Sequence, residues 1–386
     1  MALDFRFSPE QETFRAQVRE FARNEIQPYL ADWDEREEMP WPAIRKMGEA
    51  GLLGIIAPGR LGGQAKDYIT LGIAVEEVAR VDNSCAMILS MQNTLATLIP
   101  GWGDDTVREV VRGRQLLCIA TSEAEAGSDV SNMRTTARVE DGHFVVSGQK
   151  IHVSLMPGAT VMGVSARVTD GDGRGKIHFL RVPAADPGVS CELMPEMGLR
   201  SHQLAIVNLK DVRIPMTDVL GAKGEGKALL YARWNVSRCL TALNALGAAQ
   251  QVLDDSIDFV RRKHVYGRPI GMNQAISFPL VEHATRVEAC RLLAYKGLWM
   301  NDRGENAARE AGMAKWSSVT FSIQAVYDCL QMHGAAGYLK DLSLERRYRD
   351  LLGLTFTGGT INVMKMIVVK ELLGTEFMGI ANGPEH

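Results

Sequence analysis

The chain of 386 residues is 46% hydrophobic and 23% charged, which is ordinary for a globular protein and enough for two or three domains with separate cores. A formal net charge of −3 provides no basic surface for nucleic acid. No apolar run reaches the roughly 18 residues that a membrane span needs. We therefore expect neither a nucleic-acid nor a membrane partner.

Cysteine and histidine usage argues against disulfides and metal sites. The six cysteines are scattered without a Cys-x-x-Cys pair, which is typical of reduced thiols. The eight histidines are isolated from one another and from cysteine pairs, so we expect no zinc site. The first residues lack the basic and apolar regions of a secretory signal, and we expect a cytoplasmic protein.

Residues 1–118 are predicted to form a helical domain. Ser8 can cap a helix that has Pro9 at its first position and Gln11 at its third, which is a capping-box pattern. Two further helices are predicted at 41–50 and 71–81, separated by a glycine-rich turn at 57–63.

The sequence pattern changes twice after this region. Residues 119–222 contain short β-type runs and are predicted to form a compact β domain. The runs lie at 143–147, 160–168, 176–182 and 204–209, with a hairpin loop at 170–173. Helical periodicity returns over residues 223–386, with long helices predicted at 229–265, 275–300, 307–330 and 362–373.

Five segments resemble one enzyme family. Residues 122–129 (SEAEAGSD), 148–154 (GQKIHVS) and 357–360 (TGGT) resemble the flavin-binding and catalytic segments of acyl-CoA dehydrogenases. Residues 262–269 (RKHVYGRP) and 331–338 (QMHGAAGY) resemble two further flavin-contacting segments, and all five fall in the family's order. The resemblance implies a mainly α fold with a central β domain, built from an N-terminal helical domain, a middle β-barrel domain and a C-terminal four-helix bundle. It also implies a homotetramer that binds FAD.

The first two segments are expected to surround the flavin ring. The resemblance implies that Ser122 bonds the ring, that Gly127 allows close backbone approach, and that Ser128 lies near both cofactor and substrate. Ser154 keeps the hydroxyl that the family directs at the hydride-accepting nitrogen. His152 stands where the family usually has tryptophan, and it can stack on the ring, donate to the flavin, or act as an acid or base.

Later segments carry cofactor contacts that, in the family, come from a neighbouring subunit. Lys263 replaces an arginine, and it keeps the charge for a diphosphate but not the planar two-pronged donor geometry. The other cofactor-binding positions implied by the resemblance are Gln274, Gln331, Gly334, Ala335, Thr360 and Asn362.

Substrate positions are also implied by the resemblance. Asn235 and Arg238 match residues that contact the coenzyme A chain, Ser128 matches a contact near the pantetheine, and Gly359 adjoins the reacting end. Pantetheine is common to coenzyme A and acyl carrier protein, so both thioester carriers stay open.

Gly358 marks the main departure from the family, because it occupies the position of the usual glutamate base. Its backbone N–H can still donate to the thioester carbonyl, since that donor does not depend on a side chain. Ser237 occupies the second position where some members carry the glutamate. The structural alternative is a turn that requires glycine at both 358 and 359. Candidate replacement bases are His152, Tyr231 and residues near Asn93.

Three interpretations of the vacant base position stay open. The first is an FAD-dependent dehydrogenase of acyl thioesters, acting on CH–CH groups with an atypical base or with shifted γ,δ regiochemistry and passing electrons to an electron-transferring flavoprotein. The second is a redox-neutral elimination on the same fold, such as acyl-CoA desulfination. The third is a non-catalytic protein that binds flavin or thioester.

Overall fold

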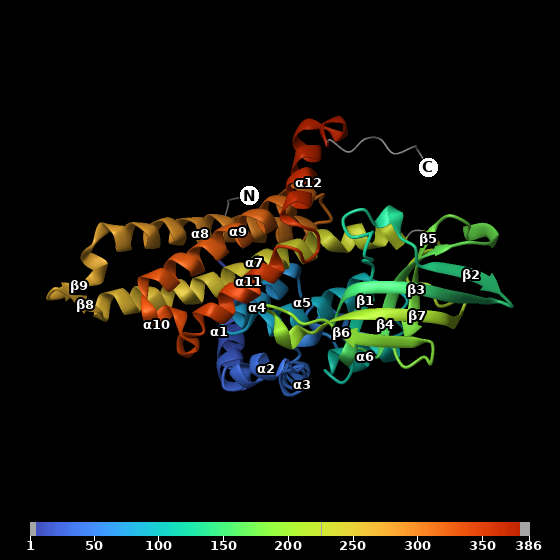
Figure 1. The fold of residues 1–386 in the computed structure, drawn as a ribbon, viewed down its shortest axis with the longest axis horizontal. Coiled ribbons are helices and arrows are strands. Elements are labelled where there is room, and N and C mark those ends of the chain that lie inside the picture. The colour runs from blue at the N-terminus through green and yellow to red at the C-terminus, as the bar shows by residue number, and fades with distance from the viewer. Residues whose placement is uncertain (1–4, 225, 379–386) are drawn as a thin grey trace. The chain divides into compact units, whose positions relative to one another are not determined.

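The computed structural model describes residues 5–224 and 226–378, and the side chains of residues 131, 172 and 226–232 are outside the description. The chain divides into two compact units, Met1–Trp234 and Asn235–His386. Figure 1 labels the helices and strands of each unit.

The first unit opens with helices whose starts follow from their capping residues. The expected capping box is present, because the Gln11 backbone N–H donates to Ser8 Oγ and the Ser8 N–H donates to Gln11 Oε1, each over 3.1 Å. Asp67 and Asp82 cap two later helices in a similar way. The helices are α1 (Pro9–Phe21), α2 (Leu30–Arg36), α3 (Trp41–Glu49), α4 (Tyr68–Ala79), α5 (Asn83–Leu98) and α6 (Asp104–Val111), with a π-helical turn at Ala22–Ile26.

A seven-stranded sheet follows these helices. Its strands are β1 (Leu117–Ala120), β2 (Thr136–Glu140), β3 (His143–Ser154), β4 (Val161–Val168), β5 (Ile177–Pro183), β6 (Val189–Leu193) and β7 (Leu204–Pro215). The order is β1-β4-β2-β3-β7-β6, with β5 paired to β4. β4 runs parallel to β1 and β2, and the other pairs are antiparallel.

One core cluster joins the sheet to the helices of this unit. Leu95 of α5, Leu117 of β1 and Phe179 of β5 pack together with Trp102 and Leu220. The indole of Trp102 donates to the Leu95 carbonyl over 2.8 Å, which satisfies the polar atom of this buried ring. The cluster therefore fixes α5 against β1, the strand that leads into residue 122.

The second unit is helical apart from one hairpin. Its helices are the main part of α7 (Gly226–Arg262), α8 (Gln274–Asp302), α9 (Ala308–Met332), α10 (Ala335–Tyr338), α11 (Leu344–Leu354) and α12 (Ile361–Leu373). The hairpin pairs β8 (His264–Val265) with β9 (Arg268–Pro269). Tyr266 and Gly267 at its tip both have positive φ, as a two-residue hairpin turn requires.

Helix α9 lies at the centre of this unit. It packs against α8, α11 and α12. Its buried face is rich in small residues, among them Ala311, Ala314, Ser318, Ser322 and Ala325. Small side chains let neighbouring helices approach closely, and this explains how one helix can contact three others. Within the described ranges, no helix combines the length and apolar character that crossing a bilayer would require.

Candidate functional site

Two of the predicted segments are joined by a buried ion pair. Lys150 is 0% exposed, and its Nζ lies 2.7 Å from Glu123 Oε1 and 3.3 Å from Ser165 Oγ. The backbone N–H groups of Arg134 and Thr135 also donate to the Glu123 carboxylate, over 2.6 and 3.1 Å. The ion pair therefore joins the segment 122–129 to the segment 148–154, and the two backbone donors hold the same carboxylate against residues 134 and 135.

The charge state of this pair follows from its contacts. Burial alone would raise the pKa of Glu123, but the hydrogen bonds from Lys150, Arg134 and Thr135 outweigh it and lower the pKa. Burial lowers the pKa of Lys150, and the carboxylate offsets only part of this effect. A backbone bond adds a second link, since the N–H of Ile151 donates to the Ser122 carbonyl over 2.9 Å.

A β-bulge places His152 at this junction. The register between β3 and β7 shifts between Lys150 and Val153, and His152 has a φ of 54°. Its side chain is exposed, whereas Val153 is buried. Bulges redirect side chains next to functional sites, so the irregularity explains how the ring is presented outward. The exposed ring is compatible with each of the three roles predicted for it.

The remaining predicted residues of this unit lie around the same junction. Ser122 and Ser154 are half-buried, and Gly127 and Ser128 are exposed. A Cβ atom added at Gly127 would meet no atom within 4 Å. Open space at Gly127 and an exposed ring at His152 fit a flat, largely apolar group such as a flavin ring.

The segment at 357–360 forms a turn before α12. The Thr360 side chain caps this helix by accepting from the Val363 N–H over 3.2 Å, and Asn362 lies exposed in the first turn. Gly358 has a φ of 64° and Gly359 a φ of 103°. A Cβ atom on Gly359 would lie 2.9 Å from Met364 Cε, whereas one on Gly358 would meet nothing within 4 Å. The Met364 methyl is the end of a flexible side chain and can move aside, so both positions are restricted mainly by their left-handed backbone angles.

Sequence reasoning missed Lys315, which holds this turn. The side chain is 0% exposed, and its Nζ donates to the carbonyls of Thr357 and Gly359, the residues on either side of Gly358. Burial lowers the pKa of Lys315 to about 7, with a further contribution from Arg238. The only sequence signal was a lysine inside a run of small residues on a predicted helix, and that signal alone does not indicate a role.

The other cofactor positions gather at the opposite end of α9. His333 stacks on Phe259 with ring centroids 4.2 Å apart, which joins the end of α9 to the end of α7. Gln331, Gly334 and Ala335 are exposed beside it, and Lys263 follows Phe259 by four residues. Gln274, also exposed, begins α8 just after the hairpin.

These positions are far from the 357–360 turn within one protomer. Lys315 contacts the turn, and Gln331 lies 16 residues further along α9, which corresponds to roughly 24 Å of helix. One flavin ring does not span that distance. The structure therefore separates the predicted cofactor residues of this unit into two groups.

Several predicted substrate and base residues have other partners. Arg238 Nη1 donates to Asn235 Oδ1 over 3.4 Å, so these two residues are neighbours on one helical face. The Asn93 amide donates to the carbonyls of Leu52 and Leu89, which assigns it a structural role and argues against it as a base. The side chain of Tyr231 lies outside the described residues.

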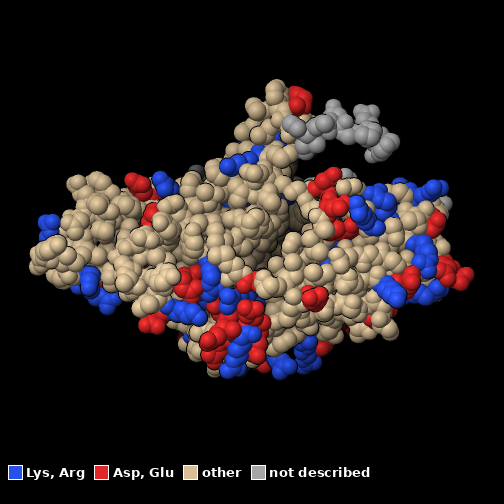
Figure 2. Space-filling model, viewed as in Figure 1, with Lys and Arg blue, Asp and Glu red and all other residues tan. Residues whose placement is uncertain are grey.

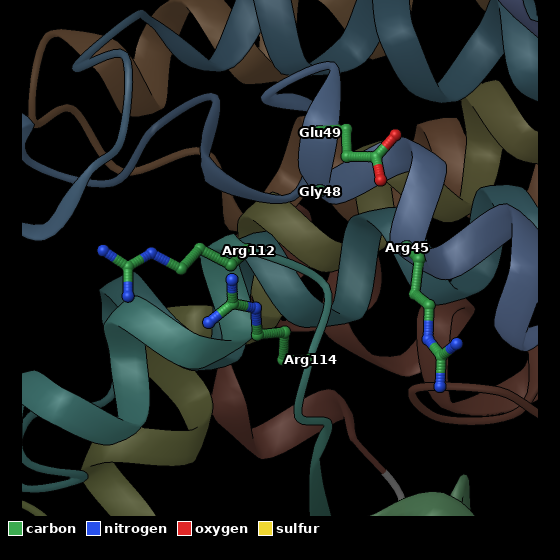
Figure 3. Close-up of a pocket in the computed structure, with 5 residues that line it drawn as sticks. All are labelled: Arg45, Gly48, Glu49, Arg112 and Arg114. Carbon is green, nitrogen blue, oxygen red and sulfur yellow. The ribbon is translucent and has the colours of Figure 1, made fainter.

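A surface pocket of the first unit is lined by Arg45, Gly48, Glu49, Arg112 and Arg114 (Figure 3). It contains none of the residues predicted from the sequence. Arg112 and Arg114 are paired with Glu109, and Figure 3 shows the side chains pointing in different directions rather than toward a common centre. We assign it no function. Within the described part of the chain, no group of three or more His, Cys, Asp or Glu side chains could hold a metal ion.

Comparison with known proteins identifies the class. Family models for the N-terminal, middle and C-terminal domains of acyl-CoA dehydrogenases match residues 8–112, 118–212 and 224–373. The chain is therefore an oxidoreductase that acts on CH–CH groups. It belongs to the acyl-CoA dehydrogenase family, and the fold expected from the sequence is confirmed.

Individual relatives resemble the chain along nearly its whole length. An acyl-CoA dehydrogenase of Bacillus subtilis is 32% identical over 372 residues, covering 95% of this chain and 98% of the relative. The caffeyl-CoA reductase–Etf complex subunit CarC of Acetobacterium woodii is 30% identical over 381 residues, with coverages of 95% and 99%. The structure of butyryl-CoA dehydrogenase from Megasphaera elsdenii matches with a TM-score of 0.91 at 25% identity, covering 96% of this chain and all of that one.

Proposed function

We propose that the chain is an FAD-dependent oxidoreductase of acyl thioesters that works without a glutamate at the usual base position. The observation that carries this proposal is the turn at Gly358. Space beside Gly358 is open, and among the described residues no carboxylate makes a hydrogen bond or ion pair with residues 357–360. The other four segments that resemble the family precede this turn in the sequence.

Cofactor-binding positions are proposed in each unit. Ser122, Gly127, Ser128, His152 and Ser154 would contact the ring and its nearby polar groups. Positions from the second unit would come from a neighbouring subunit, as in the family, and they are Lys263, Gln274, Gln331, Gly334, Ala335, Thr360 and Asn362. FAD supplies a hydride acceptor to this site when bound.

The turn would activate the thioester through its backbone. The Gly358 N–H would donate to the thioester carbonyl, and Gly359 would lie beside the reacting end. Lys315 would keep the N–H in place, because it holds the carbonyls on both sides of Gly358. A positioned general base contributes about 10²–10⁴ in rate, so its loss disfavours ordinary proton removal from the α carbon.

Dehydrogenation at the γ and δ carbons fits the absence of a base beside the α carbon. Conjugation in a 2-enoyl thioester carries acidity to the γ carbon, where a more distant base such as His152 could act. Redox-neutral elimination, such as desulfination of an acyl-CoA, is the second candidate, because it requires no proton abstraction at the α carbon. The third candidate is a non-catalytic protein that binds flavin or a thioester.

The thioester carrier would be held by Ser128, Asn235 and Arg238, which suit the pantetheine and phosphate regions of coenzyme A or acyl carrier protein. Electrons would pass to an electron-transferring flavoprotein, a proposal supported by the CarC relative, which is part of an Etf complex. We also propose a cytoplasmic location and domain boundaries of 1–118, 119–222 and 223–386.

A homotetramer is supported by the surface of the second unit. Tyr266 is 100% exposed and Tyr338 is 81% exposed, and both are large apolar rings. Figure 2 shows few charged side chains on the visible surface of α8 and α9. Phe278, Val281 and Trp299 of α8 are also exposed, and exposed apolar side chains that lie together mark protein interfaces.

Anaerobic mixing with acyl thioesters tests the proposed function. Saturated, 2-enoyl and sulfinated acyl-CoA substrates would be added to the FAD-loaded protein while the flavin absorbance near about 450 nm is recorded. Loss of this absorbance with 2-enoyl substrates supports dehydrogenation with shifted regiochemistry. Product without loss of absorbance supports elimination, and neither signal with any thioester refutes an enzymatic role.

A further inference from the structure

Lys315 is a buried cation of the second unit whose acceptors are both backbone carbonyls. The side chain is 0% exposed, and its Nζ donates to the carbonyls of Thr357 and Gly359. Among the described residues no carboxylate is paired with it, whereas Lys150, which is also buried, has the Glu123 carboxylate at 2.7 Å. A buried charge without a carboxylate is costly, so we expect Lys315 to serve the turn that it holds.

The middle of this turn depends on the lysine. Gly358 and Gly359 follow each other, and glycine has the greatest backbone freedom of all residues. Other contacts hold the two ends, because the Thr357 hydroxyl donates to a carbonyl of α11 over 3.2 Å and the Thr360 side chain caps α12. Among the described contacts, those of Lys315 span the two glycines. The ammonium therefore fixes how the peptide groups around Gly358 are oriented.

The same contacts set the direction of the Gly358 N–H. All described peptide bonds are trans, and in a planar trans peptide the carbonyl and the N–H of the next residue point in opposite directions. Because the Thr357 carbonyl points to the buried ammonium, the Gly358 N–H points away from it. Gly358 is exposed, and its N–H makes no hydrogen bond with any described residue. This donor is therefore directed outward, where a ligand can reach it.

The charge of Lys315 also strengthens the donor. An ammonium that binds a carbonyl oxygen draws electron density through the peptide group, and hydrogen bonds that share a peptide group polarise one another. The Gly358 N–H thereby becomes a better donor to an oxygen that gains negative charge. A donor that is already fixed in place stabilises such a charge without having to reorganise.

We propose that Lys315 is a positioning residue for activation of the thioester carbonyl, acting through the Thr357–Gly358 peptide group, whose N–H it both orients and polarises. The assignment rests on the proposed function, because it requires a thioester whose carbonyl oxygen accepts from the Gly358 N–H. It gives the site a cation that acts on the reacting carbonyl through the backbone, in a turn that lacks the family's usual carboxylate.

Infrared spectroscopy of a bound thioester tests this assignment. Butyryl-CoA labelled with carbon-13 at its carbonyl would be added to the FAD-loaded wild type, Lys315→Met and Lys315→Gln. Lys365→Met is the control, because it removes an exposed lysine of α12 in the same unit. The carbonyl band is recorded at pH 6, where the Lys315 ammonium is present because burial lowers its pKa only to about 7. Calorimetric titration of the same samples gives the affinity, and thermal unfolding checks the fold.

We expect a lower carbonyl frequency in the wild type than in water, because a fixed and polarised donor weakens the C=O bond. The shift should be retained in Lys365→Met, reduced in Lys315→Gln and smallest in Lys315→Met. Binding to Lys315→Met should be about 10-fold weaker, as for the loss of one hydrogen bond. The order of the two Lys315 variants separates positioning from packing. A glutamine amide can still donate to a carbonyl of the turn, whereas methionine is the better replacement for a side chain that only fills buried space.

Two results would overturn the inference and leave the proposed thioester site intact. The first is a bound carbonyl band in the wild type at the same frequency as in water. The second is a folded Lys315→Met with the wild-type frequency and affinity, or with a larger shift and tighter binding than Lys315→Gln. If Lys315→Met does not fold, Lys315→Gln decides, and wild-type values for that variant would overturn the need for an ammonium. Failure of the wild type to bind butyryl-CoA would instead count against the proposed function, and against the inference with it.

Discussion

Replacing Gly358 by glutamate is the most direct test of the vacant base position. The new side chain would start from open space, because a Cβ atom there meets nothing within 4 Å. Its cost lies in the backbone, since a φ of 64° is left-handed. For a residue with a Cβ atom this conformation costs about 1–2 kcal/mol. At an unfolding entropy of about 2.1 cal/mol/K per residue, each kcal/mol lowers the Tm of a 386-residue chain by about 1 °C, so we expect a fall of about 1–3 °C.

The expected gain in rate exceeds this cost. A positioned base supplies about 10²–10⁴ in rate, equivalent to roughly 3–5 kcal/mol of transition-state stabilisation. Gly358→Glu should therefore create or strongly raise α,β-dehydrogenation of a simple saturated acyl-CoA such as butyryl-CoA. The assay is steady-state reduction of an artificial electron acceptor, with flavin content measured on the same sample.

Gly358→Gln is the matched control, because it has the same size and the same backbone strain but no base. A rate for Gly358→Glu that is no higher than that for Gly358→Gln, with flavin content and fold intact in both, would refute the assignment of this position as a vacant base site. Similar rates for the wild type and both variants would lead to the same conclusion.

Three further predictions concern the supporting residues. Lys150→Met should lower the free energy of unfolding by about 3–5 kcal/mol and reduce bound flavin, because Glu123 loses its buried cation. The double variant Lys150→Met, Glu123→Gln should recover part of this free energy, as measured by denaturant titration. The pKa of Lys315 is lowered to about 7 in the folded state. Between pH 7 and 10 this lysine is therefore protonated in the unfolded chain and largely neutral in the folded one. The free energy of unfolding of the wild type should rise by up to about 1.4 kcal/mol per pH unit over this range. Lys315→Met should lack this slope, and parallel pH profiles of the two proteins would contradict the assignment. His152→Ala should lose flavin during desalting because a stacking ring is removed, whereas retained flavin with abolished turnover would indicate a chemical role for the imidazole.

The order of the domains could be predicted from the sequence because each carries a periodic signal. The Ser8 capping box is local chemistry, and it appears as expected. Each of the four expected β runs matches a strand, although the runs at 160–168 and 176–182 start one residue early, β3 and β7 are longer than predicted, and β1, β2 and β6 were not identified individually. Helix α5 is buried on nearly all sides and so lacks the two-faced pattern that reveals a helix.

Buried charges are the part of the site that sequence reasoning could not find. Lys150 and Lys315 look like any other lysine in the chain, yet both are fully buried and hold the segments that matter. Their roles depend on which backbone carbonyls and carboxylates fold beside them. Those partners lie 27 residues away for Lys150 and more than 40 residues away for Lys315.

The Glu123–Lys150 contact has a consequence for protein engineering. Transferring the loop around residue 123 to another scaffold without the strand around residue 150 would leave the Glu123 carboxylate buried without its cation. Transferring the strand alone would leave the Lys150 ammonium buried without its carboxylate. Loop and strand therefore form one transplantable module, and chimeras should be cut outside both.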